Sequence, residues 1–501
     1  MAAIYSEYTR DRVGMFFGLT GVQLAILVAA AGPTLWMVHL GSWPEALGMM
    51  LAWCVVFVLV VVPVRGRSAT AWLLALAAHL TGVVLRWTPW RSKAATGTVE
   101  KLDEADLPGI LNGVRVHDGP PQGATNTRVA LIQNHASRSW AVTAAITHAG
   151  LALADDAERD AQAKGLTAVI NACTRNGNIS HLVFTIRSTP DDGAERREWL
   201  AGHQPAHVPN LARVVNNELA MTVGKASVRT EQFITVVVPE AALAKQAKEF
   251  GRGLDGRARA MSMVMTEVAG HLRDQLRVSQ VAWLTSPQLA AVVRSGFAPG
   301  DRAGIVEALA AQATDDGVNA DVPWAQAAAA GADTAIRHYR HDAWQSISAT
   351  LQLPDKGARI GALASVVVPT EFDERRCLAV VYSMVPESVA DRQAQSGEWK
   401  ADLADSLRTK AGVRSRARDR IAVARARGLD GKLASGNALV RPYAVASVTV
   451  PATAPIAQFG RLLDTSIRRA GFAPLRLDMS QDAGFAAATI PLGVILDQQA
   501  G

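Results

Sequence analysis

The sequence predicts a membrane-anchored α+β protein, with an N-terminal transmembrane helical hairpin followed by two or more sandwich-like α/β lobes in the cytoplasm. Three observations support this fold class. Residues 13–64 contain no lysine or arginine and only one acidic residue, Glu45. Six of the twelve tryptophans lie within the first 93 residues, as is typical of segments at a bilayer surface. Beyond residue 107, strand-like and helix-like patterns alternate.

The predicted hairpin consists of two apolar runs, residues 14–40 and 46–64, joined by a turn that contains Gly41 and Pro44. About 20 apolar residues in a helix span the hydrocarbon of a bilayer. Because only helices and closed barrels satisfy their backbone in lipid, two runs this close together predict an antiparallel helical pair.

Basic residues predict the orientation of this hairpin. Arg10 and Arg12 precede the first run, Arg65 and Arg67 follow the second, and the turn has no cation. Since cytoplasmic flanks carry the excess of lysine and arginine, both ends of the hairpin are expected in the cytoplasm. The predicted location is therefore the inner or plasma membrane, as a multi-pass protein with lipid as one partner.

Residues 68–87 complete the predicted membrane module, residues 1–93, and allow two interpretations. The segment is apolar enough for a third span, which would place residues 94–501 outside the cell. It also has polar residues near its middle and Arg and Trp at its ends, which favours a helix lying in the interface. We expect the interfacial arrangement, followed by a polar linker at 94–106.

Two α+β regions are predicted after the linker, at 107–345 and 346–501. The first begins with a strand–strand–helix–strand order, and related orders follow it. The expected strands are 128–134, 139–147, 181–187, 233–238, 279–284, 444–450, 475–479 and 485–490. The expected helices are 155–175, 240–250, 256–277, one beginning at Ser286 with Ser as N-cap, and 455–470.

Charge and cysteine content argue against a nucleic-acid-binding face, a disulfide framework and a zinc site. The first 93 residues hold seven basic and three acidic side chains, which leaves 44 basic and 42 acidic side chains in the rest of the chain. The basic excess is therefore concentrated near the predicted membrane module rather than on a nucleic-acid-binding face. The three cysteines stand far apart, which indicates neither a disulfide framework nor a zinc site.

No motif for catalysis, cofactor binding or metal binding is found, so the chain is not expected to be an enzyme. The segment at Gly224 and Lys225 lacks the earlier glycine and the hydroxyl residue of a phosphate-binding loop. His203 and His207 are separated by a proline and are interpreted as loop residues. His338 and His341 are interpreted as part of a solvated helix end.

Residues 408–427 form the one sharp basic cluster after the membrane module. Three alternatives are open: a solvated helix face paired with upstream carboxylates, a contact with a protein or an anionic membrane, and binding to nucleic acid. No aromatic residue is interleaved, so stacking on bases is not supported. The possible interaction patch consists of Arg414, Arg416, Arg418, Arg420, Arg425 and Arg427.

Several short segments resemble a family of actinobacterial integral membrane proteins encoded with conjugation-type (type IV-like) secretion genes. They are residues 65–68, 107–121, 139–148, 286–299 and 485–493. The start of the chain resembles small PrgI-type membrane subunits, and the rest is similar to the ATPase-lacking N-terminal half of VirB/TraC-type conjugation ATPases. The EccE membrane component of type VII secretion shares the plan and is the closest rival.

This resemblance implies a non-catalytic membrane subunit of a translocation machine, which scaffolds other subunits and a P-loop ATPase supplied in trans. It implies membership of an oligomeric complex and no direct contact with nucleic acid. It brings no catalytic residues or cofactors. The alternatives are an EccE-like component and a membrane-bound enzyme whose site is not visible in the sequence.

Overall fold

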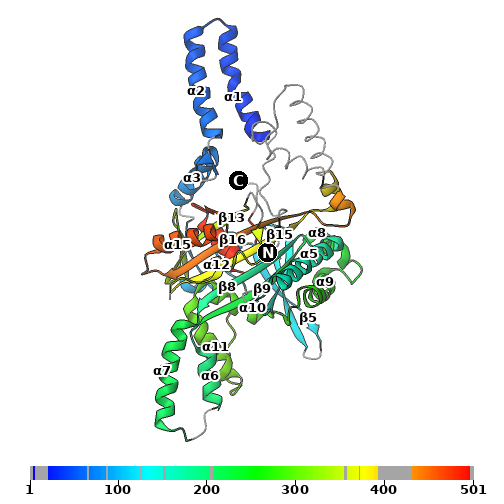
Figure 1. The fold of residues 1–501 in the computed structure, drawn as a ribbon, viewed down its shortest axis with the longest axis vertical. Helices are drawn as coiled ribbons and strands as arrows, with labels where there is room; N and C mark the ends of the chain where they lie inside the picture. Colours follow the sequence, from blue (N-terminus) through cyan, green and yellow to red (C-terminus); the bar gives the residue numbers. More distant parts are fainter. Residues whose placement is uncertain are drawn as a thin grey trace.

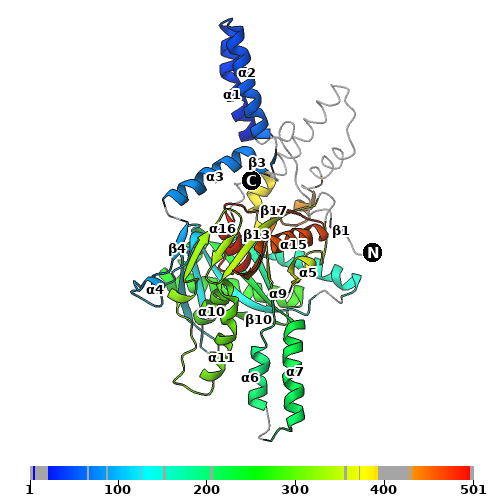
Figure 2. The same ribbon diagram turned by 90° about the vertical axis from the view of Figure 1, so that its left-hand side faces the viewer.

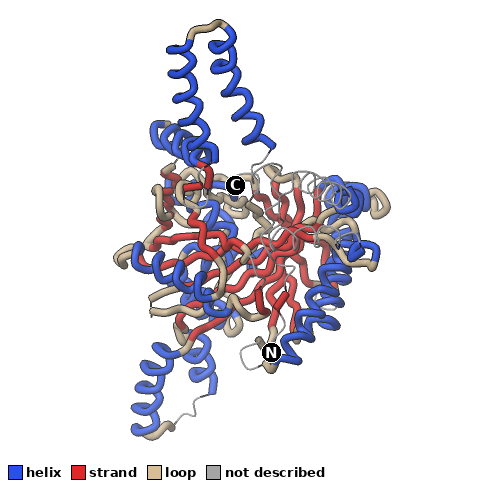
Figure 3. Tube along the Cα trace, turned by 45° about the horizontal axis from the view of Figure 1, so that its top comes forward, coloured by secondary structure: helices blue, strands red, loops and turns tan. Residues whose placement is uncertain are grey.

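The computed structural model describes residues 4–5, 21–61, 63–64, 67–85, 88–123, 126–150, 154–203, 207–354, 358–371, 373–392, 428 and 431–496. A 13-stranded antiparallel sheet runs through the centre of the molecule, with helices around it (Figure 3). Two consecutive parts of the chain build most of this sheet, and they repeat the same arrangement.

The first unit begins with the hairpin strands β5 and β6 and continues into a strand–helix–strand–strand–helix–strand order. In the sheet its main strands lie in the order β10-β7-β9-β8. Its elements are β5 (Val114–Gln122), β6 (Thr127–Asn134), β7 (Ser139–Thr147), α5 (Asp156–Asn176), β8 (His181–Pro190), β9 (Val228–Pro239), α8 (Glu240–Ala247), α9 (Gly253–Leu276), β10 (Gln280–Trp283) and α10 (Ser286–Phe297).

The second unit follows the same plan, with main strands in the order β17-β13-β16-β15. Its elements are β11 (Gly331–Thr334), β12 (Tyr339–His341), β13 (Trp344–Gln352), α12 (Ala364–Val367), β15 (Arg375–Met384), β16 (Val440–Pro451), α15 (Ile456–Arg469), β17 (Ala473–Arg476) and α16 (Gln481–Thr489). The short β4 (Pro89–Arg91) pairs with β11 at the far edge. Both units are therefore ferredoxin-like βαββαβ arrangements, each with an added hairpin before and a helix after.

The two units join through antiparallel pairing of β8 with β15, which we call the seam. Pro239 and Pro451 are equivalent, because each ends its strand opposite the first residue of β7 or β13. Phe233 and Val445 lie the same number of residues before these prolines and pair with Thr185 and Ala379. Thr185 and Ala379 are thus equivalent, and they also pair with each other across the seam. A pseudo-twofold axis passes through this pair.

Helices cover both faces of the sheet. On one face α5 and α9 pack on the first unit around Val236 and Met261, and α15 packs on the second around Val448 and Leu463. On the other face lie α10 and α16, with the C-terminal residues Ile490 to Val494. Local signals place these helices: the Asp155 side chain caps α5 at its start, and Gly177 ends it with a positive φ.

An apolar helical hairpin, α1 (Gly21–His39) and α2 (Trp43–Val61), projects from one end of the molecule, and α3 (Ala69–Val84) lies between it and the sheet (Figure 2). None of the described helices, however, combines the length and the apolar composition that crossing a membrane requires. The described helix α1 has 19 residues and includes Gln23 and Pro33. α3 has only 16 residues.

This finding contradicts three predictions: the membrane-anchored fold class, the transmembrane assignment of the hairpin, and the multi-pass location in the inner or plasma membrane. The predicted separate sandwich-like lobes are also wrong, because strands of both regions share one sheet. The predicted boundary at 345/346 falls just inside β13. What dominates the fold is the 13-stranded antiparallel sheet.

A second projection, the α6–α7 arm, leaves the opposite end of the molecule (Figure 1). It consists of α6 (Ala194–His203) and α7 (Asn210–Ala226), inserted between β8 and β9. The equivalent connection in the second unit, between β15 and β16, leaves the other end of the seam because the two strands are antiparallel. The predicted basic cluster at 408–427 belongs to that connection and lies outside the described residues.

Candidate functional site

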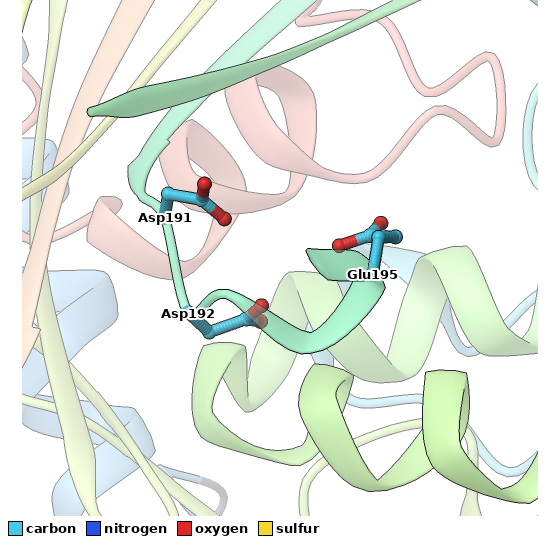
Figure 4. Close-up of side chains that lie close together, drawn as sticks. All are labelled: Asp191, Asp192 and Glu195. Carbon is cyan, nitrogen blue, oxygen red and sulfur yellow. The ribbon is translucent and has the colours of Figure 1, made fainter. Parts of the chain in front are cut away.

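Three carboxylates gather where the α6–α7 arm leaves the sheet. Asp191 and Asp192 follow β8, and Glu195 lies in the first turn of α6 (Figure 4). One oxygen of each lies within 4.8 Å of the others. Oxygen ligands of this kind suit hard divalent cations, so the local geometry alone would allow a metal site.

Arginine side chains already pair with two of these carboxylates, Asp192 and Glu195, and Asp191 accepts hydrogen bonds from the Gly193 N–H and the Ser227 hydroxyl. Arg302, at the start of α11 (Arg302–Gln312), donates to Asp192 at 2.7 Å and also pairs with Glu195. Arg229 of β9 pairs with the same oxygen of Glu195, Oε1, as Arg302 does. Arg302 is only 12% exposed, so its charge is a fixed part of the site. The cluster is therefore an ion-pair network that ties α6 to α11 and β9.

The protonation states agree with this assignment. Burial by itself would raise the pKa of Asp192, but the Ala194 N–H and the Arg302 guanidinium bring that pKa below its ordinary value. Burial opposes ionisation of Glu231 too, and Arg187 together with Arg229 lowers its pKa. Both carboxyls are thus charged near neutral pH, as partners of arginine.

The network continues inward from Glu231 to the seam. Arg187 of β8 pairs with Glu231 at 2.6 Å and is 2% exposed. Its guanidinium also donates to the Val292 carbonyl at 2.8 Å and to the Ser295 hydroxyl at 3.3 Å. A charged group of the first sheet unit therefore holds the end of α10.

From the second unit, Arg375 of β15 reaches the same helix end. It donates to the carbonyl oxygens of Ser295 and Gly296 at 2.8 and 2.6 Å. These carbonyls end α10 and carry the negative end of its dipole, which favours a cation. Burial lowers the pKa of Arg375 to about 10, which still leaves it charged at neutral pH. Arg187 and Arg375 thus clamp α10 from opposite sides of the seam.

His341 of β12 completes this buried cluster. Its Nδ1 lies 2.6 Å from the Phe297 carbonyl, to which it donates, and its Nε2 lies 2.8 Å from the Ser346 hydroxyl. Burial lowers the pKa of His341 to about 3, so the ring is neutral. A serine beside a histidine is the geometry of nucleophilic catalysis. Both residues are wholly buried, however, so no substrate can reach them.

A shallow surface hollow of about 620 Å³ lies elsewhere, along α9, lined by Phe250, Arg259, Ser262, Met263, Thr266 and Glu267. It contains neither the carboxylate cluster nor the buried histidine. Its wide opening and mostly apolar lining give no convergent set of reactive groups.

The α6–α7 arm itself carries uncovered apolar side chains. On α7 Leu211, Val214, Val215 and Leu219 are 75, 52, 45 and 44% exposed. Three of them repeat every fourth residue, which places them on one helix face. On α6 Trp199 is 60% exposed and stacks on His203 with ring centres 4.4 Å apart. Apolar surface of this extent on a projecting element is typical of a protein-binding site.

The residues singled out from the sequence lie in different places. Arg10, Arg12 and Arg65 are outside the described residues, as is the patch from Arg414 to Arg427. Arg67 lies in the two-residue strand β3 (Arg67–Ser68), opposite Val64. The described residues do not test the roles of these arginines, which stay predictions.

The histidine interpretations fare unequally. His203 ends α6 rather than lying in a loop, whereas His207 lies in the connection between α6 and α7. The predicted solvated helix end at His338 and His341 is wrong, because His341 lies in a strand and is wholly buried. Tyr339 and His341 are both buried, and Arg340 between them is exposed. This alternation with a period of two is the signal that could have predicted a strand here.

Comparison with known proteins adds no assignment. No protein-family model matches the chain, and no curated protein matches it.

Proposed function

We propose that this protein is a non-catalytic scaffold subunit of a multiprotein machine, which binds one partner through the α6–α7 arm and another at the opposite end. The observation that carries the proposal is the uncovered apolar face of α7 on an arm whose root is tied to α11 and β9 by ion pairs. Apolar side chains left exposed on a projecting element contribute little to the stability of the isolated chain but fit a docking role.

The other end supports a bridging role. Leu35, Trp36 and Trp43 on the α1–α2 hairpin are 68, 63 and 72% exposed. The hairpin and the arm lie at opposite ends of the sheet body (Figure 1). Two apolar projections that face away from each other can bind two partners at once, which is the geometry of a scaffold.

For the arm we propose a P-loop ATPase supplied in trans, the partner that the resemblance to conjugation proteins implies. The chain has no phosphate-binding loop of its own. A scaffold of this kind would position the ATPase and leave nucleotide hydrolysis to it.

The experiment is purification of the tagged full chain from its native host, with the co-purifying proteins identified by mass spectrometry. We expect an ATPase that is released by the double variant Leu211→Asp/Leu219→Asp. The matched control, Asn217→Asp, adds a charge on the exposed opposite face of the same helix and should retain the partner. A chain that purifies as a monomer without partners, or equal retention by both variants, contradicts the proposal.

A further inference from the structure

The apolar face of α7 contains one charge, Glu218. With 3.6 residues per turn, position 218 lies between Val215 and Thr222 and on the same side as Leu211 and Leu219. Glu218 is exposed, and none of the described residues pairs with its carboxylate. A docked partner would therefore meet an apolar ridge with one negative charge inside it.

The described cation of α7 does not neutralise this face. Arg213 lies two residues from Val215, hence on the opposite side of the helix, where it pairs with the Asn210 side-chain oxygen. Around the root of the arm, Arg197 pairs with Glu307 at 3.1 Å, and Arg302 and Arg229 pair with Glu195, so these three cations are already engaged. The exposed carboxylate of Glu218 is therefore free to pair with a cation on another molecule.

This arrangement disfavours a second copy of the chain as the occupant. An antiparallel pairing of two α7 helices centred on Val215 would place Leu211 opposite Leu219, which is favourable. The same pairing would place Glu218 opposite Ala212 of the other copy. A carboxylate buried without a counter-ion costs several kcal/mol, which offsets much of the gain from the apolar contact.

We propose that the α6–α7 arm binds an amphipathic helix of a different protein, one with apolar residues at every fourth position and a lysine or arginine that pairs with Glu218. Ridges of i, i+4 residues on both helices interdigitate in the commonest class of helix packing. The ion pair within the contact fixes the register and rejects helices with an acidic residue at that place. The proposal rests on the docking role given above and specifies the chemistry of the partner.

The test uses the full chain and two synthetic helical peptides of roughly 21 residues, a length at which an isolated helix is marginally stable. The peptides share a leucine ridge and differ at one adjacent position, lysine in one and glutamate in the other. We expect the chain to bind the lysine peptide at least about fivefold more tightly, because the glutamate peptide would bring two carboxylates together in the contact. Glu218→Lys should reverse this preference, and the control Asn217→Lys should leave it unchanged.

Several outcomes would overturn the inference. The first is equal affinity for both peptides, or a preference that Glu218→Lys does not change. The second is a dimer in sedimentation equilibrium that Leu219→Asp dissociates, which would make a second copy the occupant. Failure to bind either peptide also overturns it, while the docking role is judged separately by release of the native partner from Leu211→Asp/Leu219→Asp.

Discussion

Replacing Gly165 by alanine should destabilise the protein, although alanine is the better helix former. Gly165 is buried in α5 where that helix meets the C-terminal end of α9. A Cβ at this position would lie 2.9 Å from the carbonyl carbon of Gln275, and closer still to its oxygen. Backbone atoms of a helix cannot move aside as a flexible side chain can, so α5 must shift away from α9.

The magnitude follows from two opposing effects. Overpacking of a core costs up to about 3 kcal/mol when the backbone has to move. The Gly→Ala change in a helix contributes about 1 kcal/mol in the favourable direction. Gly165→Ala should therefore lower the free energy of unfolding by about 2 kcal/mol.

Gly270→Ala is the matched control, because Gly270 lies in α9 with no atom within 4 Å of a Cβ. It should raise stability by up to about 1 kcal/mol. The assay is urea unfolding followed by circular dichroism, with the free energy extrapolated to water. A Gly165→Ala protein as stable as the wild type would refute the close approach of α5 and α9.

Three further outcomes follow from the structure. Arg302→Met leaves Asp192 and Glu195 without their main cation, so amide exchange in α6 should become faster, with a loss of about 2 kcal/mol in the local free energy of opening. Unchanged exchange would contradict the role of Arg302 in tying α6 to α11. His341 has a native pKa of about 3, below its unfolded value, so its contribution to stability is present above about pH 6.5 and is lost as the pH falls toward 3. His341→Gln should flatten this acid dependence of unfolding, and superimposable curves would argue against it. A maleimide should label Cys54 alone in the native protein, because the other two cysteines are buried; mass spectrometry counts the labels.

Much of the sheet could be predicted from the sequence because its strands are rich in β-branched residues and are bounded by residues that interrupt strands, such as proline, glycine and aspartate. The predicted strand 139–147 coincides with β7, and predicted helix 155–175 lies within one residue of α5 at both ends. Alternation of exposed and buried residues, with Asp and Gly at the ends, is local information.

The C-terminal helix shows where local patterns fail. Residues 485–490 were expected to be a strand but lie mostly in α16, whose side chains are nearly all buried. A segment that is apolar on every side has no periodicity by which helix and strand can be told apart. Gly484 lets this helix lie directly on the sheet, since a Cβ there would sit 2.7 Å from the Ser348 Cβ.

The sequence pattern places the start of α10 one residue too late. The capping box uses Thr285 as N-cap, with Gln288 reaching back to its backbone, so Ser286 is already helical. Threonine and serine are both good caps, and only the geometry of the preceding strand selects between them.

The carboxylate cluster and the buried histidine could not be predicted because they depend on pairings between distant segments. Arg302 meets Asp192 only after α11 folds against the arm, and Arg375 reaches Ser295 only across the seam. The repeat of two units was likewise invisible as sequence identity: equivalent positions such as Thr185 and Ala379 share a place in the sheet but not a side chain.

The pseudo-twofold axis has a consequence for how this molecule can specialise. In a true homodimer every substitution appears twice, so an arm changed to suit one ligand changes at both ends. Here the two halves belong to one polypeptide. A substitution in the β8–β9 connection is therefore not repeated in the equivalent connection between β15 and β16, and the two connections can change independently. One chain that carries both halves can therefore have different connections at the two ends of the seam, although the sheet between them is symmetric.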